Sequence, residues 1–251
     1  MRALARRRPS AAVVAAIDAL MCVRKTYHMA SHAALMQAGV IPLLLDAMCF
    51  NFTDSGFQVV CLRYIRSLSR HHGLSVMLKK MGVAELIFRF MQQNADDHKG
   101  LGSALGALLC LEAMQTPGEG IDFFADTCGM QCVLGATVKC AFREDHVRAI
   151  RLVDYLQDKS RATTARLLEL NMVRFVLYVM QCDPCELVMQ TASSVLDRLS
   201  SHPLFESQLL TSAVPQKVLD MIKAYLDNAK LQRHARRMKA RFQRRDKLAS
   251  A

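Results

Sequence analysis

Apolar residues recur along this chain in a short sequence motif. In each copy, one run with helical spacing ends at a small residue and a second apolar run follows at once. Successive copies lie 43, 47, 42 and 41 residues apart. Within each copy the apolar positions are spaced three or four residues apart, which is typical of one face of an α-helix. A helical unit with a period of about 40–47 residues indicates a solenoid, in which stacked units share one core. The small residues are Gly39, Gly82, Gly129, Asn171 and Ser212.

Each unit is predicted to contain three helices. A short first helix ends at the small residue, because Gly and Asn tolerate the left-handed backbone conformation found at helix ends. A second helix follows directly, and Pro42 and Pro215 lie in its first turn, where the missing N–H is not needed. The third and longest helix follows a polar turn that supplies N-cap residues, such as Asp183. No stretch alternates cleanly with period two, so strands are not expected.

This pattern closely resembles armadillo repeats over about residues 12–227, and the related HEAT repeats share its period. The resemblance implies an all-α fold, namely a right-handed α-solenoid of about five armadillo-like three-helix repeats, followed by a basic C-terminal helix. Residues 12–30 align only with a third helix, so a partial first repeat is expected there. Because solenoid ends need polar caps, we expect its apolar edge to be covered by another chain or by a preceding part of a longer protein.

The net charge of +11 is concentrated at the two ends of the chain. Residues 1–11 form a basic arm and residues 228–251 a basic tail, whereas the array between them is close to neutral. This distribution argues against a nucleic-acid platform that covers the whole body. An Arg-rich start before an apolar run is also typical of a targeting peptide, and this alternative stays open. No apolar stretch has the roughly 20 residues that span a bilayer.

The armadillo resemblance also implies where a partner would bind, because the third helices of that family line a concave groove. Nuclear-import members of the family carry Trp and Asn there to hold a basic peptide, and this chain has neither at the aligned positions. It carries Arg instead, which can grip carboxylates with two hydrogen bonds, so an acidic partner segment is predicted. The alternative is a helix face that is charged only because it is exposed. The expected groove residues are Arg63, Arg66, Arg70, Arg151, Tyr155 and Arg198.

Residues 228–248 are predicted to form one helix with an apolar stripe and otherwise basic or polar faces. Such helices are typical of calmodulin targets, membrane-surface helices and nucleic-acid arms. The segment also resembles an incomplete IQ motif, the helix that docks calmodulin and related EF-hand light chains, although Arg237 replaces the Gly of the full motif. A solvated basic tail is the alternative. The residues expected to take part are Leu231, Gln232, Arg236, Met238, Arg241 and Phe242.

Residues that would support catalysis or metal binding form no recognisable pattern. The nine Cys are an odd number at scattered apolar positions, which indicates reduced, packed thiols and a cytoplasmic protein. Cys182 and Cys185 form a single CxxC pair without further ligands, so zinc is not expected. The glycines that begin at Gly100 depart from the nucleotide-binding fingerprint. We therefore expect no enzyme activity, no cofactor and no metal.

Taken together, these patterns predict a non-catalytic scaffold that binds a partner protein along its groove, with a tail helix that docks a calmodulin-like protein. A first alternative keeps the fold and makes the tail an anchor to anionic membrane or to nucleic acid. A second alternative is a structural component of the cytoskeleton or cilium.

Overall fold

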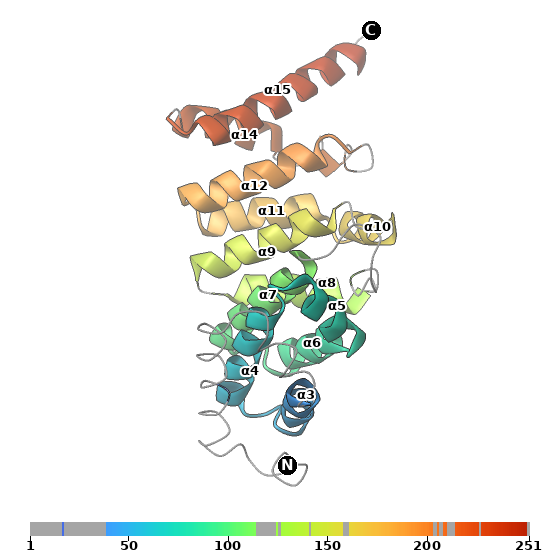
Figure 1. Cartoon of the computed structure of the whole chain (residues 1–251). Coiled ribbons are helices and arrows are strands. Elements are labelled where there is room, and N and C mark those ends of the chain that lie inside the picture. Colours follow the sequence, from blue (N-terminus) through green and yellow to red (C-terminus); the bar gives the residue numbers. More distant parts are fainter. Residues whose placement is uncertain are drawn as a thin grey trace. The chain divides into compact units, whose positions relative to one another are not determined.

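A computed structural model describes residues 17, 39–113, 124, 127–140, 142–157, 161–202, 205, 208–209, 214–225 and 227–249. Over this part of the chain it contains twelve α-helices and no strand, so the prediction of an all-α fold is confirmed (Figure 1). The basic arm 1–11, all of the expected partial repeat 12–30 except Ile17, and the expected hinge at Ser212 lie outside the described residues.

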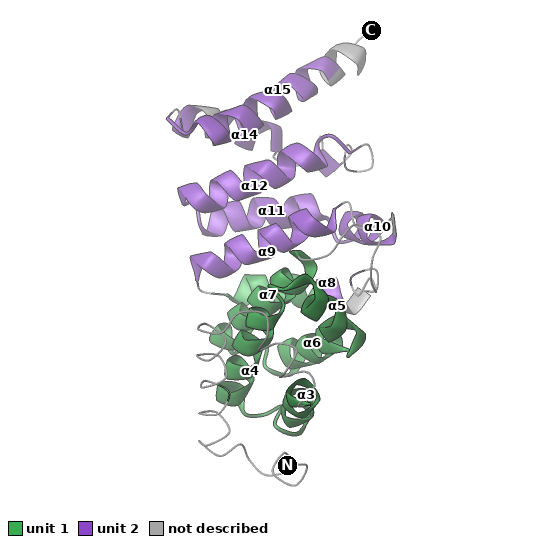
Figure 2. Cartoon of the chain, viewed as in Figure 1, with its two compact units in different colours: residues 1–123, 131–141 green, residues 124–130, 142–251 purple. Residues whose placement is uncertain are grey.

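The chain divides into two compact units (Figure 2). Unit 1 comprises residues 1–123 and 131–141, and unit 2 comprises residues 124–130 and 142–251, so the division falls within α8. The helices of unit 1 are α3 (Val40–Phe50), α4 (Ser55–Leu68), α5 (His72–Lys80), α6 (Val83–Gln93), α7 (His98–Ala113) and most of α8 (Thr127–Lys139). Those of unit 2 are α9 (Arg143–Leu156), α10 (Arg161–Glu169), α11 (Met172–Cys182), α12 (Glu186–Leu199), α14 (Val214–Ala224) and α15 (Ala229–Ala249).

Unit 1 is built around α7, which packs against α4, α5 and α6. Its core is apolar, but it includes one ion pair, in which the Lys79 ammonium of α5 contacts the Glu112 carboxylate of α7. Both side chains are almost fully buried, at 2% and 3% exposure. Removing one partner of a buried pair costs about 3–5 kcal/mol, because the other charge is left uncompensated. The pair therefore fixes how α5 lies on α7.

Unit 2 contains a layer of three long helices, in which α12 lies between α9 and α15 (Figure 1). The helices α11 and α14 pack against α12 and α15 respectively. Fully buried apolar side chains such as Val153, Leu196 and Met238 point from the three long helices into this core. The layer leaves one side of each long helix exposed to solvent.

Three of the five small residues singled out in the sequence have positive φ. Gly39, Gly82 and Asn171 have φ values of 68°, 76° and 51°, and each directly precedes a helix. A left-handed residue with a β-carbon costs about 1–2 kcal/mol, which explains the choice of Gly twice. Asn171 offsets part of this cost because its Oδ1 accepts a hydrogen bond from the Arg174 N–H at 3.4 Å.

The helix break expected at Gly129 is wrong. Helix α8 begins at Thr127, so Gly129 lies inside its first turn and is buried. The first four N–H groups of a helix have no partner within the helix, and a glycine there weakens the helix less than one in its middle. The small residue therefore fits a buried helical position as well as a hinge.

Many polar contacts within each unit join residues that are 40–44 positions apart. In unit 1, Ser55 bonds to Asp97 and Asn94 to Phe52, both across 42 residues. In unit 2, the side-chain amide of Gln208 bonds to the Leu168 carbonyl, 40 residues away. Segments about 40–44 residues apart in the sequence are therefore neighbours in space within each unit.

Candidate interaction surface on α9, α12 and α15

Helix α15 begins at a residue that also ties it to α12. The Oδ1 of Asn228 accepts a hydrogen bond from the Leu231 N–H at 2.9 Å, which makes Asn228 an N-cap. The Nδ2 of the same side chain donates to Glu186 Oε1 at 2.6 Å, at the first residue of α12. The first turn of α15 is thus placed beside the first turn of α12.

The apolar stripe of α15 is buried in the core of unit 2. Leu231, Ala235 and Met238 have 0% exposure and Phe242 has 7%, because the helix packs against α12 and α14. The expectation that a separate tail helix follows an array ending near residue 227 is therefore wrong. Burying a large apolar side chain stabilises by about 1.5–3 kcal/mol, so a helix with this stripe gains more by packing than by standing free in solvent.

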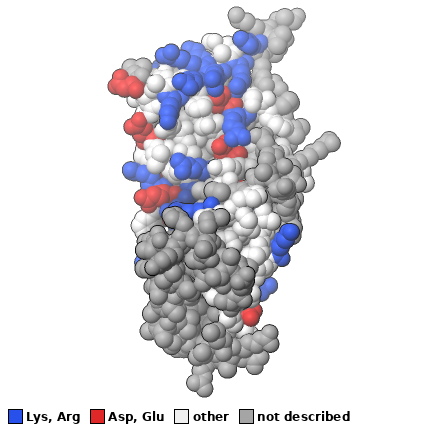
Figure 3. Space-filling model, viewed as in Figure 1, with Lys and Arg blue, Asp and Glu red and all other residues white. Residues whose placement is uncertain are grey.

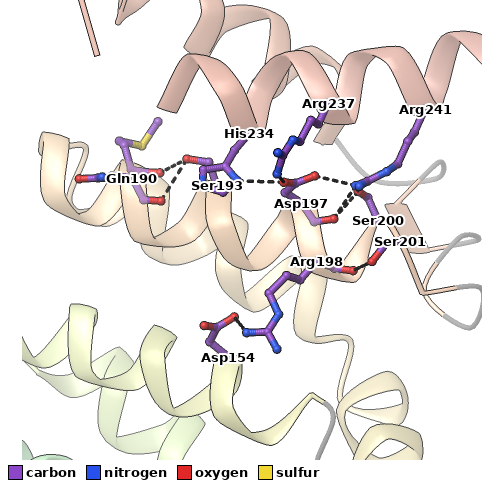
Figure 4. Close-up of polar contacts among 11 residues, drawn as sticks. Asp154, Gln190, Ser193, Asp197, Arg198, Ser200, Ser201, His234, Arg237 and Arg241 are labelled. Carbon is purple, nitrogen blue, oxygen red and sulfur yellow. Dashed lines mark hydrogen bonds and ion pairs between the residues drawn. The ribbon is translucent and has the colours of Figure 1, made fainter. Parts of the chain in front are cut away.

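One buried carboxylate binds the polar side of α15 to α12 (Figure 4). Asp197 is 5% exposed. Its Oδ2 lies 2.9 Å from His234 Nδ1, and its Oδ1 and main-chain carbonyl each accept from Arg241 Nη1 at 2.6 Å. Arg241 also donates to the Ser200 hydroxyl, and Arg237 Nη1 lies 3.8 Å from Asp197 Oδ2. Charge-assisted hydrogen bonds of this kind are stronger than neutral ones.

The side of α15 opposite its apolar stripe is exposed and basic. Arg233, Arg237 and Arg244 lie within an arc of about 40°, at about 100° per residue, and Lys230 adjoins them. The exposed basic residues are Lys230, Arg233, Arg236, Arg237 and Arg244. The single acidic residue in the sequence of this helix is Asp246. Lys and Arg gather over α15 and α12 on the face shown in Figure 3, with a few acidic side chains among them.

The exposed sides of α9 and α12 carry the other residues expected in unit 2. Arg151 and Tyr155 of α9 are exposed, Tyr155 by 51%, and no ion pair joins Arg151 to another described residue. Arg198 of α12 is exposed as well, but its Nη1 lies 3.0 Å from Asp154 Oδ1 of α9. Arg198 therefore serves at least partly to join two helices, as Arg241 does between α12 and α15.

The remaining expected residues fall into two groups. In unit 1, Arg63 is exposed, Arg66 is half-buried and Arg70 is exposed in the turn that follows α4. In α15, Arg236 is exposed, whereas Gln232 is buried and donates to the Tyr225 carbonyl at 3.0 Å. Most residues of the IQ-like pattern thus make contacts within the fold.

Sequence reasoning missed Asp197 and His234, although a signal for Asp197 was present. Asp197 precedes Arg241 by 44 residues, close to one repeat period, and precedes His234 by 37. An acidic residue placed one period before a basic helix is a candidate contact between neighbouring long helices. The prediction of a separate tail helix excludes such a contact.

Other kinds of site find no support in the part of the chain that the structure describes. No group of three or more His, Cys, Asp or Glu side chains could hold a metal ion there. None of the helices searched combines the length and apolar character that a membrane crossing requires.

The chain was compared with protein-family models, curated proteins and solved structures. No family model matches the chain, and neither a curated protein nor a solved structure matches it.

Proposed function

We propose that this chain is a non-catalytic protein-binding scaffold, built as an armadillo-like α-solenoid of about five repeats. Two observations support the repeat. Gly39, Gly82 and Asn171 adopt left-handed conformations before helices one or more periods apart, and polar contacts within each unit join residues 40–44 apart. A solenoid offers extended surfaces rather than one closed pocket, which suits a binding role.

In this proposal α15 is the third helix of the last repeat. It packs beside α12 as α12 packs beside α9, and Arg241 reaches Asp197 across 44 residues. The array therefore extends through residue 249 instead of ending near residue 227. The basic segment becomes part of a rigid surface rather than a flexible tail.

We propose that an acidic segment of a partner protein binds across the exposed sides of α9, α12 and α15. The observation that carries this proposal is the exposed basic side of α15, where the described side chains include five exposed Lys and Arg and the sequence of the helix holds one acidic residue. Arg151 extends the basic surface onto α9. Arg is suited to the task because its planar guanidinium can bind a carboxylate through two hydrogen bonds.

A terminal helix of a solenoid needs a polar outer side in any case, to keep the array soluble. Mixed charges would meet that need, as they do in Glu–Lys patterned helices. A side with one sign of charge instead repels itself and attracts anions. This excess of one sign favours a binding role over a simple cap.

The other partners considered for this segment are less well supported. Calmodulin-type docking uses an apolar stripe, and here that stripe is buried, so such docking would require α15 to leave the core. The described residues of α15 expose no large apolar or aromatic side chain. Insertion into a membrane interface and stacking on nucleic-acid bases both need such side chains, so α15 itself offers neither.

The test is the affinity of the full chain for a fluorescent Glu-rich peptide, measured by anisotropy. The α15 variant carries Arg233→Glu, Arg236→Glu and Arg244→Glu, three positions without a contact to Asp197. A matched control carries the same charge change on α11 and α14, at Arg174, Lys217 and Lys223, for which no ion pair is found among the described residues.

Exposed ion pairs are worth about 0.2–1 kcal/mol each, and reversal adds repulsion to their loss, so the α15 variant should bind about tenfold or more weakly. The control should bind like the wild type. Equal losses of peptide affinity in the two variants would show that net charge alone sets the affinity, and this result would overturn the proposal. Tighter binding of anionic vesicles or a single-stranded oligonucleotide than of the peptide would favour those partners instead.

A further inference from the structure

A second basic position lies in unit 1, where Arg66 of α4 crosses the backbone of α7 at Gly106. A β-carbon placed on Gly106 would lie 3.3 Å from Arg66 Cδ and Nη1 and 3.4 Å from its Nε. These separations are shorter than ordinary van der Waals contacts. The guanidinium therefore occupies the space that a side chain at position 106 would need, and it packs on the backbone of this glycine.

The nitrogen atoms of Arg66 differ in their surroundings. Nε is buried and has no hydrogen-bond partner, which costs about 1–3 kcal/mol for a buried donor. The two terminal nitrogens are not among the buried atoms without a partner, and no hydrogen bond or ion pair of theirs to a described residue is found. The guanidinium thus lies over Gly106, and its two terminal nitrogens are free to receive an anion.

The two helices that meet at Arg66 add positive charge and no exposed acidic side chain. Arg63 lies three residues before Arg66 on α4, and the two share a helix face because positions three apart are neighbours there. The side chain of Arg63 is exposed. Arg70 is exposed in the turn after α4. The sequence of α4 contains no Asp or Glu, and the one acidic residue of α7, Glu112, is buried against Lys79.

We propose that Arg66, which packs on Gly106 and is flanked by Arg63 and Arg70, is a carboxylate-binding position for an acidic segment of a partner protein. This inference rests on the proposed function for the class of partner, but it uses residues of unit 1 alone. It assigns Gly106 the role of a positioning residue, which holds the guanidinium with its terminal nitrogens outward. A carboxylate meets those two nitrogens end-on, in a bidentate contact.

Two observations favour an acidic peptide over other anions. The described residues of α4 and α7 expose no aromatic side chain, so bases of a single-stranded nucleic acid would find nothing to stack on. They also expose no large apolar side chain that could enter a membrane interface. A narrow peptide segment can reach the half-buried Arg66, whereas a flat lipid surface meets the more exposed Arg63 and Arg70 first.

The experiment measures binding of the Glu-rich peptide to the full chain in the background of the α15 variant, so that α15 no longer dominates the signal. Three further substitutions are compared there: Gly106→Ala, Gly106→Val and Arg66→Lys. The glycine substitutions keep every charge and displace the guanidinium by increasing amounts. Arg66→Lys keeps the charge and removes the planar fork. Gly73→Ala is the control, because a β-carbon there meets no atom within 4 Å.

We expect weaker peptide binding in graded steps, about threefold for Gly106→Ala and about tenfold for Gly106→Val and Arg66→Lys, the loss of roughly one charge-assisted hydrogen bond. Gly73→Ala should change nothing.

Binding that is insensitive to all three substitutions overturns the inference, and Arg66→Lys decides if a glycine variant fails to fold. If the α15 variant binds no peptide, this inference fails while the proposed function stands. If the wild type binds none, both fail. An oligonucleotide that binds more tightly with the same dependence on Arg66 overturns the peptide assignment.

Discussion

Replacing Asp197 by Ala tests whether α15 is an integral helix of the fold. The substitution leaves His234, Arg237 and Arg241 without their shared acceptor. Breaking a fully buried ion pair costs about 3–5 kcal/mol. The side chains of His234, Arg237 and Arg241 are 23%, 58% and 34% exposed, so water can replace part of what they lose. We therefore expect a loss of about 2–3 kcal/mol, close to one or two charge-assisted hydrogen bonds.

The loss should appear as a lower urea midpoint for unfolding with an unchanged slope. It should also appear as faster amide hydrogen exchange in α15, because opening of this helix becomes easier while α11 keeps its protection. Asp154→Ala is the matched control, since it removes the acceptor of Arg198 between more exposed partners, at 46% and 28% exposure. That change should cost less than about 1 kcal/mol. A cost for Asp197→Ala no greater than that of Asp154→Ala, with unchanged exchange in α15, would refute the reasoning.

Two glycines and two cysteines of the described residues give further predictions. Gly100→Ala should destabilise by about 1–3 kcal/mol, because its β-carbon would overlap the Asp97 carboxylate. Gly73→Ala, which meets nothing, should be neutral or stabilise by up to about 1 kcal/mol, and thermal unfolding that ranks the two variants equally would contradict this. Burial raises the pKa of the Cys61 thiol, so this residue stays protonated and should resist iodoacetamide until the chain unfolds, whereas exposed Cys182 reacts in the native state. Mass spectrometry of partially alkylated protein separates the two, and native labelling of Cys61 at the rate of Cys182 would argue against this packing.

Local sequence was sufficient to predict the helices and three left-handed positions. Gly39, Gly82 and Asn171 satisfy a demand of the backbone itself, and this demand depends on residues close in sequence. The prediction of a helix break at Gly129 was wrong because a glycine also fits the first turn of a buried helix. No neighbouring residue distinguishes a glycine that ends a helix from one that lies inside it. The choice between them is made by packing.

The position of α15 could not be predicted because it depends on side chains one period away. The stripe at Leu231 and Met238 was visible in the sequence, but the surface that buries it belongs to α12 and α14. An amphipathic basic helix looks the same whether its apolar side meets another protein or its own core. Asp197 decides between these cases, and its contact with Arg241 spans 44 residues, so nothing close to it in the sequence indicates that contact.

The central claim is that one side of α15 belongs to the core while the other binds an acidic partner, and lysine footprinting tests it most directly. The full chain is acetylated with and without the Glu-rich peptide, and the modified residues are quantified by mass spectrometry. Lys230 lies on the exposed side of α15 and Lys223 is exposed on α14. The account predicts that the peptide slows acetylation of Lys230 and leaves Lys223 unchanged. Equal protection of both lysines, or protection of Lys223 alone, would contradict it.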